Sequence, residues 1–387
     1  MKKNIGIHEP FFSGNEIKYV SKCIKSGWVS TTGNFLNLFE KKIKKITKSK
    51  YVLPVLNGTI GLHLSMILSK IEKNDEVIVP TITFIASVNA IRYLNAIPVF
   101  MDTDEHLNID EAKTIEFIKN KTKKVGKFSI NIKTKRKIKA IVIIHTFGNA
   151  AKFEKLYSLC KKKNIKLIED AAESLGTFYK KGIFKKKHTG TIGDFGVISF
   201  NGNKIITSGN GGALLIQKRN DYLKGKHIIS QSKNDSIKFI HNELGYNYRL
   251  SNICAALGLA QLEKLNFFLK KKKEVRKNYK FFFKNFNRIE ILKTPDYSLN
   301  NNWLNLVKIN KKIKNVNKLI LQMNKNNIQA RPIWHPNHLQ KHLKNFERYK
   351  IELSTKSVKK IICLPSSPFL KKKEIKRISN VLKKNLI

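Results

Sequence analysis

The sequence has few cysteines and no paired cysteine motif. Its four cysteines (Cys23, Cys160, Cys254 and Cys363) are far apart in a chain of 387 residues, and no two form a CxxC pair. A disulfide framework or a structural zinc site needs several cysteines at short spacing. The sequence therefore predicts a reduced, cytosolic protein that has neither a disulfide frame nor a metal site.

Long apolar stretches are also missing. No run approaches the roughly 18 uninterrupted apolar residues that a membrane-spanning helix needs. The first residues, MKKNIGIHEPFF, include two lysines but lack the apolar segment of a secretory signal peptide. We therefore expect no membrane span, no signal peptide and a cytoplasmic location.

Acidic residues are scarce. The chain has 76 lysines and arginines against 27 acidic residues, which gives a formal net charge of +49. Such a charge attracts polyanions. Lysine greatly outnumbers arginine, however, and short lysine clusters are spread along the chain, whereas nucleic-acid readers favour arginine together with aromatic residues. We interpret the charge as a compositional bias and expect no specific nucleic-acid partner. A basic nucleic-acid-binding protein on an inert fold is the distant alternative.

The sequence is rich in apolar strands that alternate with amphipathic helices. This alternation predicts an α/β domain with a mostly parallel sheet that is covered on both faces. A basic insert at 119–139 interrupts the pattern, and we interpret it as a solvated loop in preference to a hairpin. The strands are expected at 51–55, 76–80, 97–102, 140–146, 166–170, 196–200 and 213–217, and the helices at 34–47, 58–68, 84–95 and 151–163.

The alternation stops after residue 250. A long helix is expected from 251 to about 287, and short strands and two further helices follow it. We therefore divide the chain into an N-terminal arm with a large α/β domain (1–250) and a linking helix with a smaller α+β domain (251–387).

Polar residues follow the predicted strands, at the edge where open α/β sheets bind ligands. Asn57-Gly58-Thr59 opens the helix after the first strand, and the free amides at a helix N-terminus suit a phosphate. Asp170 ends a later strand, where a carboxylate can pair with a protonated pyridine nitrogen. Taken alone, the first feature is equally consistent with a plain turn, and the second more often indicates a helix cap.

A glycine-rich turn that carries Lys204 follows the next strand. Ser199 precedes this lysine by five residues, and a glycine cluster follows it. A buried lysine can lose its proton and attack a carbonyl group. We therefore hypothesise that Lys204 forms a Schiff base with pyridoxal 5′-phosphate (PLP) and that Ser199 faces the phosphate. Phe84 can stack on a flat ring, although a core phenylalanine is the commoner case.

Motifs along nearly the whole chain resemble the DegT/DnrJ/StrS family of sugar aminotransferases. This resemblance implies the aspartate-aminotransferase fold, which is fold type I of PLP enzymes. The segment HTGTIGDFGVISFNGNKIITSGNGG is most similar to a branch that aminates nucleotide-linked 4-keto-6-deoxy sugars, including 2-acetamido sugars, for legionaminic and related nonulosonic acids. The other motifs are SGWVSTTG, NGTIGLHL, PTITFIASVNAI, IEDAAESLG and GYNYRLSNICAALGLAQLE.

The resemblance implies roles for the residues around the cofactor ring. Lys204 would form the Schiff base and later move the proton between carbons. Asp170 would pair with the pyridine nitrogen, Phe84 would stack on the ring, and Glu173 would hydrogen-bond near the cofactor. A lysine at position 204, where dehydratases of the family have histidine, favours transamination.

The resemblance also implies how the phosphate and the substrates are bound. Thr59, the Ile60 amide and Ser199 would hold the phosphate, and Asn247 would reach the partner's cofactor in a homodimer with shared active sites. The substrates would be a nucleotide-linked keto sugar and glutamate, and amination at C3 or of another nucleotide sugar is the alternative. Candidate residues that face the sugar are Trp28, Ser30, Thr31 and His335.

Overall fold

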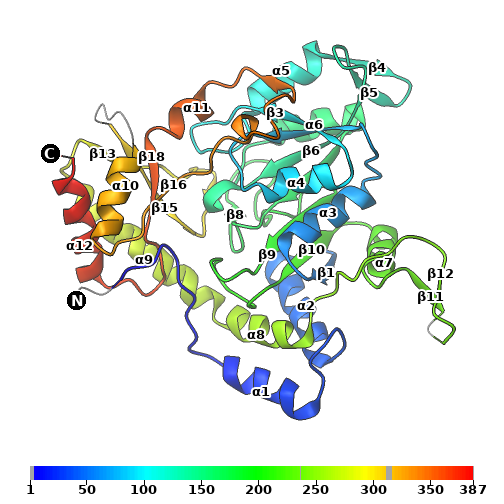
Figure 1. Ribbon diagram of the computed structural model, residues 1–387, viewed down its shortest axis with the longest axis horizontal. Helices are drawn as coiled ribbons and strands as arrows, with labels where there is room; N and C mark the ends of the chain where they lie inside the picture. The colour runs from blue at the N-terminus through cyan, green and yellow to red at the C-terminus, as the bar shows by residue number, and fades with distance from the viewer. Residues whose placement is uncertain (1–3, 236, 311–315, 387) are drawn as a thin grey trace.

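The large sheet is the centre of the molecule in the computed structural model, which describes residues 4–235, 237–310 and 316–386 (Figure 1). Among these residues ten strands form this sheet, whose main path runs β1–β10–β9–β7–β6–β2–β3–β17, and β5 joins β4 to β6. The strands are β1 (Tyr51–Val55), β2 (Glu76–Pro80), β3 (Ile97–Met101), β4 (Thr122–Val125), β5 (Phe128–Asn131), β6 (Lys137–Ile144), β7 (Lys166–Asp170), β9 (Phe195–Ser199), β10 (Gly212–Ile216) and β17 (Arg348–Tyr349).

The centre of this sheet is parallel, as the sequence predicts. The pairs β9–β7, β7–β6, β6–β2, β2–β3 and β3–β17 are parallel, whereas β10 pairs antiparallel with both β9 and β1. Every residue of β2, β9 and β10 is buried, because helices cover both faces. The apolar runs in the sequence therefore correspond to strands that are buried on two sides.

The basic insert at 119–139 is a hairpin, so its interpretation as a solvated loop is wrong. Strands β4 and β5 pair antiparallel, and β5 continues the sheet by pairing with the first residues of β6. Lys123 and Lys124 of β4 are exposed, while Ser129 and Asn131 of β5 are buried. The buried positions of β4 and β5 are polar, so the sequence does not show the apolar alternation of a strand that has one solvated face.

Helices cover the sheet on both faces. One face packs against α3 and α4, and the other packs against α5 and α6. The first helix ends at Gly27, which has a left-handed conformation (φ 73°). The helices of this part are α1 (Glu16–Ser26), α2 (Asn34–Thr47), α3 (Gly58–Leu68), α4 (Ala86–Tyr93), α5 (Glu111–Asn120), α6 (Glu154–Lys163) and α7 (Arg219–Ile228), with the 3₁₀ turn η1 (Thr146–Gly148).

The C-terminal part has a second, antiparallel sheet in the order β13–β15–β18–β16. Ile5 of the N-terminal arm bridges to Ile328 here, so the arm packs on this part (Figure 1). Two short strand pairs lie elsewhere, β8–β14 and β11–β12. The bounds are β8 (Phe178–Tyr179), β11 (Lys233–Asp235), β12 (Ile240–His241), β13 (Ile289–Ile291), β14 (Ser298–Leu299), β15 (Asn305–Ile309), β16 (Arg331–Pro332), β18 (Ile361–Leu364), α10 (Val316–Lys325), η2 (Asn337–Leu339), α11 (Leu353–Ser357) and α12 (Lys372–Lys384).

The single long helix expected from residue 251 is instead two helices. The first, α8 (Asn252–Glu263), packs against α1 and α2, and the second, α9 (Leu265–Phe283), packs against β13 and α12. They meet at Lys264, whose backbone is not helical. The division of the chain at residue 250 stays a prediction. No helix of the described residues has both the length and the apolar surface for crossing a membrane.

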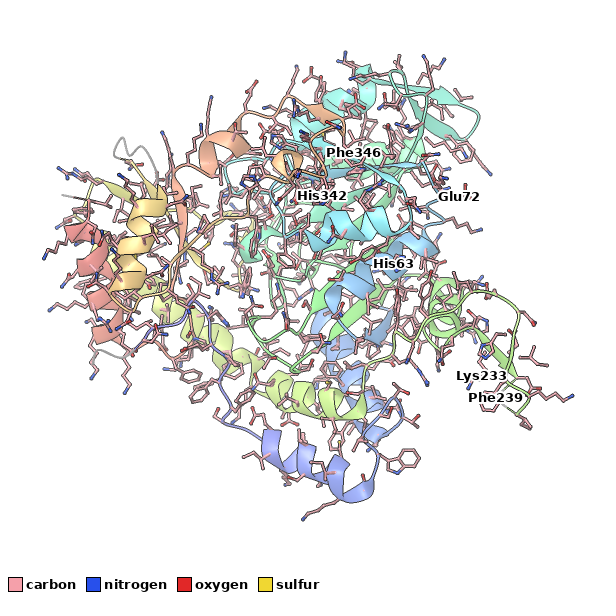
Figure 2. All side chains as sticks on the ribbon, viewed as in Figure 1. His63, Glu72, Lys233, Phe239, His342 and Phe346 are labelled. Carbon is pink, nitrogen blue, oxygen red and sulfur yellow. The ribbon has the colours of Figure 1, made fainter. Side chains whose placement is uncertain are left out.

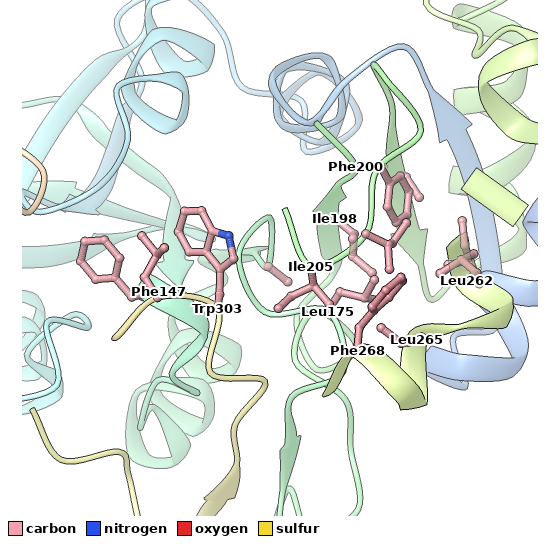
Figure 3. Packing of buried hydrophobic residues seen from close by; sticks show 14 of the residues in the cluster. Phe147, Leu175, Ile198, Phe200, Ile205, Leu262, Leu265, Phe268 and Trp303 are labelled. Carbon is pink, nitrogen blue, oxygen red and sulfur yellow. The ribbon is translucent and has the colours of Figure 1, made fainter. Parts of the chain in front are cut away.

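One buried cluster joins the lysine turn to the C-terminal part. Figure 3 shows Ile205, the neighbour of Lys204, in the same cluster as Phe268 of α9 and Trp303. The indole N–H of Trp303 donates to the Asn203 carbonyl at 2.7 Å, and its ring is stacked with that of Phe147 at a centroid distance of 6.2 Å. Both sequence neighbours of Lys204, Asn203 and Ile205, therefore contact the C-terminal part.

Candidate active site

A cavity of about 280 Å³ lies where several strands of the large sheet end. The segments that follow β1, β2, β7 and β9 line it, together with Trp334 from the C-terminal part. This is the edge at which ligands bind in open α/β sheets. Of the residues predicted from sequence, the cavity brings together Thr59, Phe84, Asp170, Glu173, Ser199 and Lys204.

The N-terminus of α3 forms one wall of the cavity. Gly58 and Thr59 line it, and their amides have no partner within a helix because they belong to its first turn. The Ile60 amide, which was expected to hold the phosphate, donates instead to Oδ1 of the N-cap Asn57 at 3.0 Å. Ser199 adjoins Gly58, since a Cβ atom placed on that glycine would lie 3.0 Å from the Ser199 Cβ. Thr59 and Ser199 therefore line the expected anion site, and the part of the Ile60 amide in it stays a prediction.

Asp170 is the last residue of β7 and is buried. Its Oδ2 accepts a hydrogen bond from Ser87 Oγ at 2.6 Å, and its Oδ1 accepts one from the Ala172 amide at 3.1 Å. Sequence reasoning missed Ser87. The available signal was a small polar residue in an otherwise apolar first turn of the helix after β2.

Lys204 lies in the turn after β9, where its amide donates to the Asn201 carbonyl at 3.0 Å. Its Nζ is 4.4 Å from the centroid of the Trp303 ring. Burial lowers the pKa of the Lys204 amine, and the nearby carboxylates of Glu173 and Asp170 oppose this shift. The arrangement favours a neutral amine, which is the form that attacks carbonyl groups.

Glu173 is buried beside this lysine. Its Oε2 accepts a hydrogen bond from the Phe147 amide at 2.6 Å. Burial raises the pKa of the carboxyl to about 7, while the charge of Lys204 lowers it and that of Asp170 raises it further. Glu173 can therefore exchange a proton near neutral pH, unlike an ordinary surface glutamate.

Aromatic rings form the outer wall of the cavity. Phe84 is 53% exposed and its ring is tilted against that of Trp334 at a centroid distance of 5.4 Å. Sequence reasoning named His335 but missed its neighbour Trp334, which lines the cavity. Asn203 was also missed. Its Oδ1 is buried without a hydrogen-bond partner among the described residues, and its side chain lines the same cavity.

The remaining candidates lie elsewhere in the single chain. Trp28, Ser30 and His335 are exposed and Thr31 is half-buried, and the described residues that line the cavity include none of these four. The loop that carries Trp28 is fixed, because Asn252 donates to the Trp28 carbonyl at 2.7 Å through its side chain. Asn247 is exposed and lies outside its own chain's cavity.

Residues 12–383 match the DegT/DnrJ/EryC1/StrS aminotransferase family. The chain belongs to this family. A GDP-perosamine synthase from Escherichia coli O157:H7 is 33% identical over 377 residues, which are 96% of this chain and 96% of the relative. A GDP-perosamine synthase from Vibrio cholerae is 34% identical over 388 residues, 98% of each chain. The solved structure of Helicobacter pylori PseC, an aminotransferase in pseudoaminic acid biosynthesis, has 24% identity, a TM-score of 0.86 and 99% coverage of both chains.

The DegT/DnrJ/EryC1/StrS match confirms the resemblance based on motifs. The protein is a PLP-dependent aminotransferase with the fold expected for such enzymes. The chemistry of the cavity fits this cofactor. One wall offers unpaired helix amides and two hydroxyl groups for a phosphate, another offers the Asp170 carboxylate, and a desolvated amine lies between buried and aromatic side chains.

Proposed function

We propose that this aminotransferase converts a nucleotide-linked 4-keto-6-deoxy sugar to the 4-amino sugar, with glutamate as the amino donor. The observation that carries the proposal is the match, along nearly the full length, to two enzymes named GDP-perosamine synthase. PseC, which shares the fold, is named as an aminotransferase involved in the biosynthesis of pseudoaminic acid. The motif resemblance to the nonulosonic-acid branch supports a 2-acetamido sugar as the second candidate.

We assign the residues that hold PLP from the geometry of the cavity. Thr59, Ser199 and the first amides of α3 would hold the phosphate, Asp170 would pair with the ring nitrogen, and Phe84 would cover one face of the ring. When bound, PLP supplies a carbonyl group for the amine and an electron sink for the carbon that loses its proton. The side chains of the protein carry out the proton transfers.

Lys204 is the residue that we expect to move the proton. Burial favours its neutral amine, which can accept a proton from one carbon and return it to another. The Trp303 ring lies below the lysine Nζ and restricts its position. Glu173 is close enough to influence the pKa of Lys204, so its protonation state adjusts the basicity of the lysine. The aromatic wall of Phe84 and Trp334 limits the access of water.

We further propose that the active unit is a homodimer in which Asn247 completes the partner's site. Asn247 is exposed and far in sequence from the lining segments, and it follows the β11–β12 hairpin that projects from the fold (Figure 1). That hairpin exposes apolar side chains, with Phe239 64% and Ile240 46% exposed, and Leu244, which follows it, is 75% exposed. Figure 2 shows Phe239 near its tip, beside Lys233. Apolar exposure on a projecting segment is typical of a surface that a second copy covers.

Trapping the cofactor tests the assignment of Lys204. Borohydride reduction of the purified protein, followed by digestion and mass spectrometry, is expected to find the phosphopyridoxyl group on the peptide that contains Lys204. Lys204→Ala should lose this adduct and the visible absorbance of the bound cofactor, while Lys166→Ala, at a surface ion pair, should keep both. An adduct on another lysine would refute the assignment.

The substrate is tested by a screen of GDP- and UDP-linked 4-keto sugars, with and without a 2-acetamido group, with glutamate as donor and mass spectrometry as readout. The proposal predicts a 4-amino product from one of these sugars. A product aminated at C3, with none at C4, would favour the alternative position. Formation of no amino sugar from any nucleotide sugar would refute the proposed substrate class.

A further inference from the structure

A buried hydroxyl group supports the carboxylate that faces the cofactor site. Ser87 lies in the first turn of α4, and its Oγ donates to Asp170 Oδ2 at 2.6 Å. Ser87 is 0% exposed and Asp170 is 7% exposed, so water does not compete for this hydrogen bond. Ser87 is not among the described residues that line the cavity, but its hydroxyl group contacts two residues that do, Asp170 and Thr83.

The orientation of Ser87 is fixed by a second hydroxyl group. Thr83 Oγ1 lies 3.1 Å from Ser87 Oγ and 3.3 Å from the Phe84 carbonyl oxygen, and because the Ser87 hydrogen goes to the carboxylate, the one Thr83 hydrogen is shared between these two acceptors. The Thr83 backbone is held in turn, since the Asn337 side chain donates to its carbonyl at 2.8 Å. The chain from Asn337 to Asp170 joins the C-terminal part to the floor of the cavity.

The two hydrogen bonds of Asp170 leave its carboxylate little freedom. Ser87 occupies one oxygen and the Ala172 amide occupies the other, so the plane of the carboxylate is defined from opposite sides. Both partners donate to the carboxylate. The nearby Glu173 accepts one backbone hydrogen bond, from the Phe147 amide, and burial raises its pKa to about 7.

We propose that Ser87 is a positioning residue that fixes the Asp170 carboxylate in the orientation in which it pairs with the ring nitrogen of PLP. This inference rests on the placement of PLP proposed above. Without the Ser87 hydroxyl group, Asp170 keeps only the Ala172 donor and can rotate away from the ring. The expected result is weaker cofactor binding and a ring nitrogen that is less firmly held in its protonated state.

A matched pair of variants isolates the hydroxyl group. Ser87→Thr and Ser87→Val add side chains of similar shape, and only the first can donate to Asp170. We expect the cofactor-free Ser87→Val protein to bind PLP about tenfold to a hundredfold more weakly than Ser87→Thr, as measured by quenching of tryptophan fluorescence. If Ser87→Val does not fold, the native protein and Ser87→Ala supply the same comparison. Ser65→Ala is the control, because this buried helical serine donates only to the Leu62 carbonyl.

Two further measurements separate positioning from a general structural effect. In an Asp170→Asn background, the difference between the threonine and valine variants should shrink to less than about threefold. The midpoint of the pH titration of the bound cofactor's visible absorbance should rise in Ser87→Val, because a poorly paired ring nitrogen withdraws less charge from the linkage to Lys204. Ser65→Ala should leave this midpoint unchanged.

Each contrary result has its own meaning. Equal PLP affinity in the threonine and valine variants would overturn the role of Ser87, as would a difference that persists in full in the Asp170→Asn background. Failure of the native protein to bind PLP would instead overturn the placement of the cofactor. The two failures are therefore distinguishable from the same set of binding curves.

Discussion

Two buried glutamates of the site region are expected to respond to the same substitution with opposite signs. Glu173 has one amide donor and a pKa raised to about 7 by burial. Glu169 is 0% exposed, and its two oxygens accept hydrogen bonds from His145 Nε2 and from three backbone amides at 2.6 to 2.9 Å. Although burial alone would raise the pKa of Glu169, these bonds lower it overall.

The Glu173 carboxyl should destabilise the cofactor-free protein as pH rises. Its pKa is higher in the folded chain than its ordinary value of 4.5, so the folded state binds more protons than the unfolded state between these two values. The rise from 4.5 to about 7 corresponds to roughly 3 kcal/mol at about pH 8 and about 1 kcal/mol at about pH 5. Because a glutamine side chain cannot ionise, Glu173→Gln should raise the free energy of unfolding. The increase should be about 2 kcal/mol larger at about pH 8 than at about pH 5.

Glu169→Gln should be destabilising at both pH values. The lowered pKa of Glu169 means that its ionised form contributes stability above pH about 4.5, and this stability is lost only as pH falls through the folded-state value. A glutamine would place an amide N–H₂ group against donors, so one or more amides of the 190–193 turn would lose their acceptor. We expect a loss of about 3 kcal/mol.

Chemical denaturation of the cofactor-free variants at one fixed protein concentration measures both effects. The change in unfolding free energy for Glu173→Gln is compared between the two pH values, so any cost of the new amide that does not depend on pH cancels. Each value is taken relative to the native protein at the same pH, so the titration of all other groups cancels as well. An unfolding free-energy change for Glu173→Gln that is equal at both pH values would refute the raised pKa. Stabilisation by Glu169→Gln would refute the assignment of its four donors.

Two further predictions concern the phosphate wall and the dimer. A Cβ atom on Gly212 would lie 2.6 Å from the Asn57 carbonyl carbon, whereas one on Gly202 would meet nothing within 4 Å. Gly212→Ala should therefore weaken PLP binding by at least about tenfold in a direct titration with PLP, and Gly202→Ala should not weaken it. Equal affinities of the two variants would contradict the close approach of Gly212 to the Asn57 backbone. If Asn247 acts across the dimer, re-assembled mixtures of Asn247→Ala with Lys204→Ala should regain about one quarter of native activity, because half of the dimers then contain one complete site. No recovery above the two separate variants would place Asn247 in its own chain's site.

The sequence predicts the strands of the large sheet better than their directions. Apolar runs identify β9 and β10 nearly to the residue, but β10 returns antiparallel to β9. The cause is the connection, since residues 200–211 contain no helix and a parallel neighbour requires a longer crossover. The break between α8 and α9 was missed for a different reason. Lys264 is an ordinary helix former, and only tertiary packing against two parts of the protein separates the helices.

Residues at strand ends were predictable because the topology determines where strand ends meet. Asp170 and Ser199 end strands, Thr59 and Lys204 follow strands, and all four line one cavity. Ser87 and Trp334 were not predictable in this way. Ser87 reaches the site through a hydrogen bond to another side chain, and Trp334 comes from a part of the chain that contacts the cavity only after the two sheets pack together.

The three ionisable groups of the cavity, Lys204, Glu173 and Asp170, have different surroundings and we expect different roles for them. Burial lowers the pKa of Lys204 and raises that of Glu173, so each shift favours the neutral form of its group. Asp170 differs from both, because two donors hold its carboxylate. A proton can therefore pass to or from Lys204 while Asp170 keeps its hydrogen-bonded orientation. This separation depends on Ser87, which is not among the described residues that line the cavity, through the hydrogen bond that joins α4 to the end of β7.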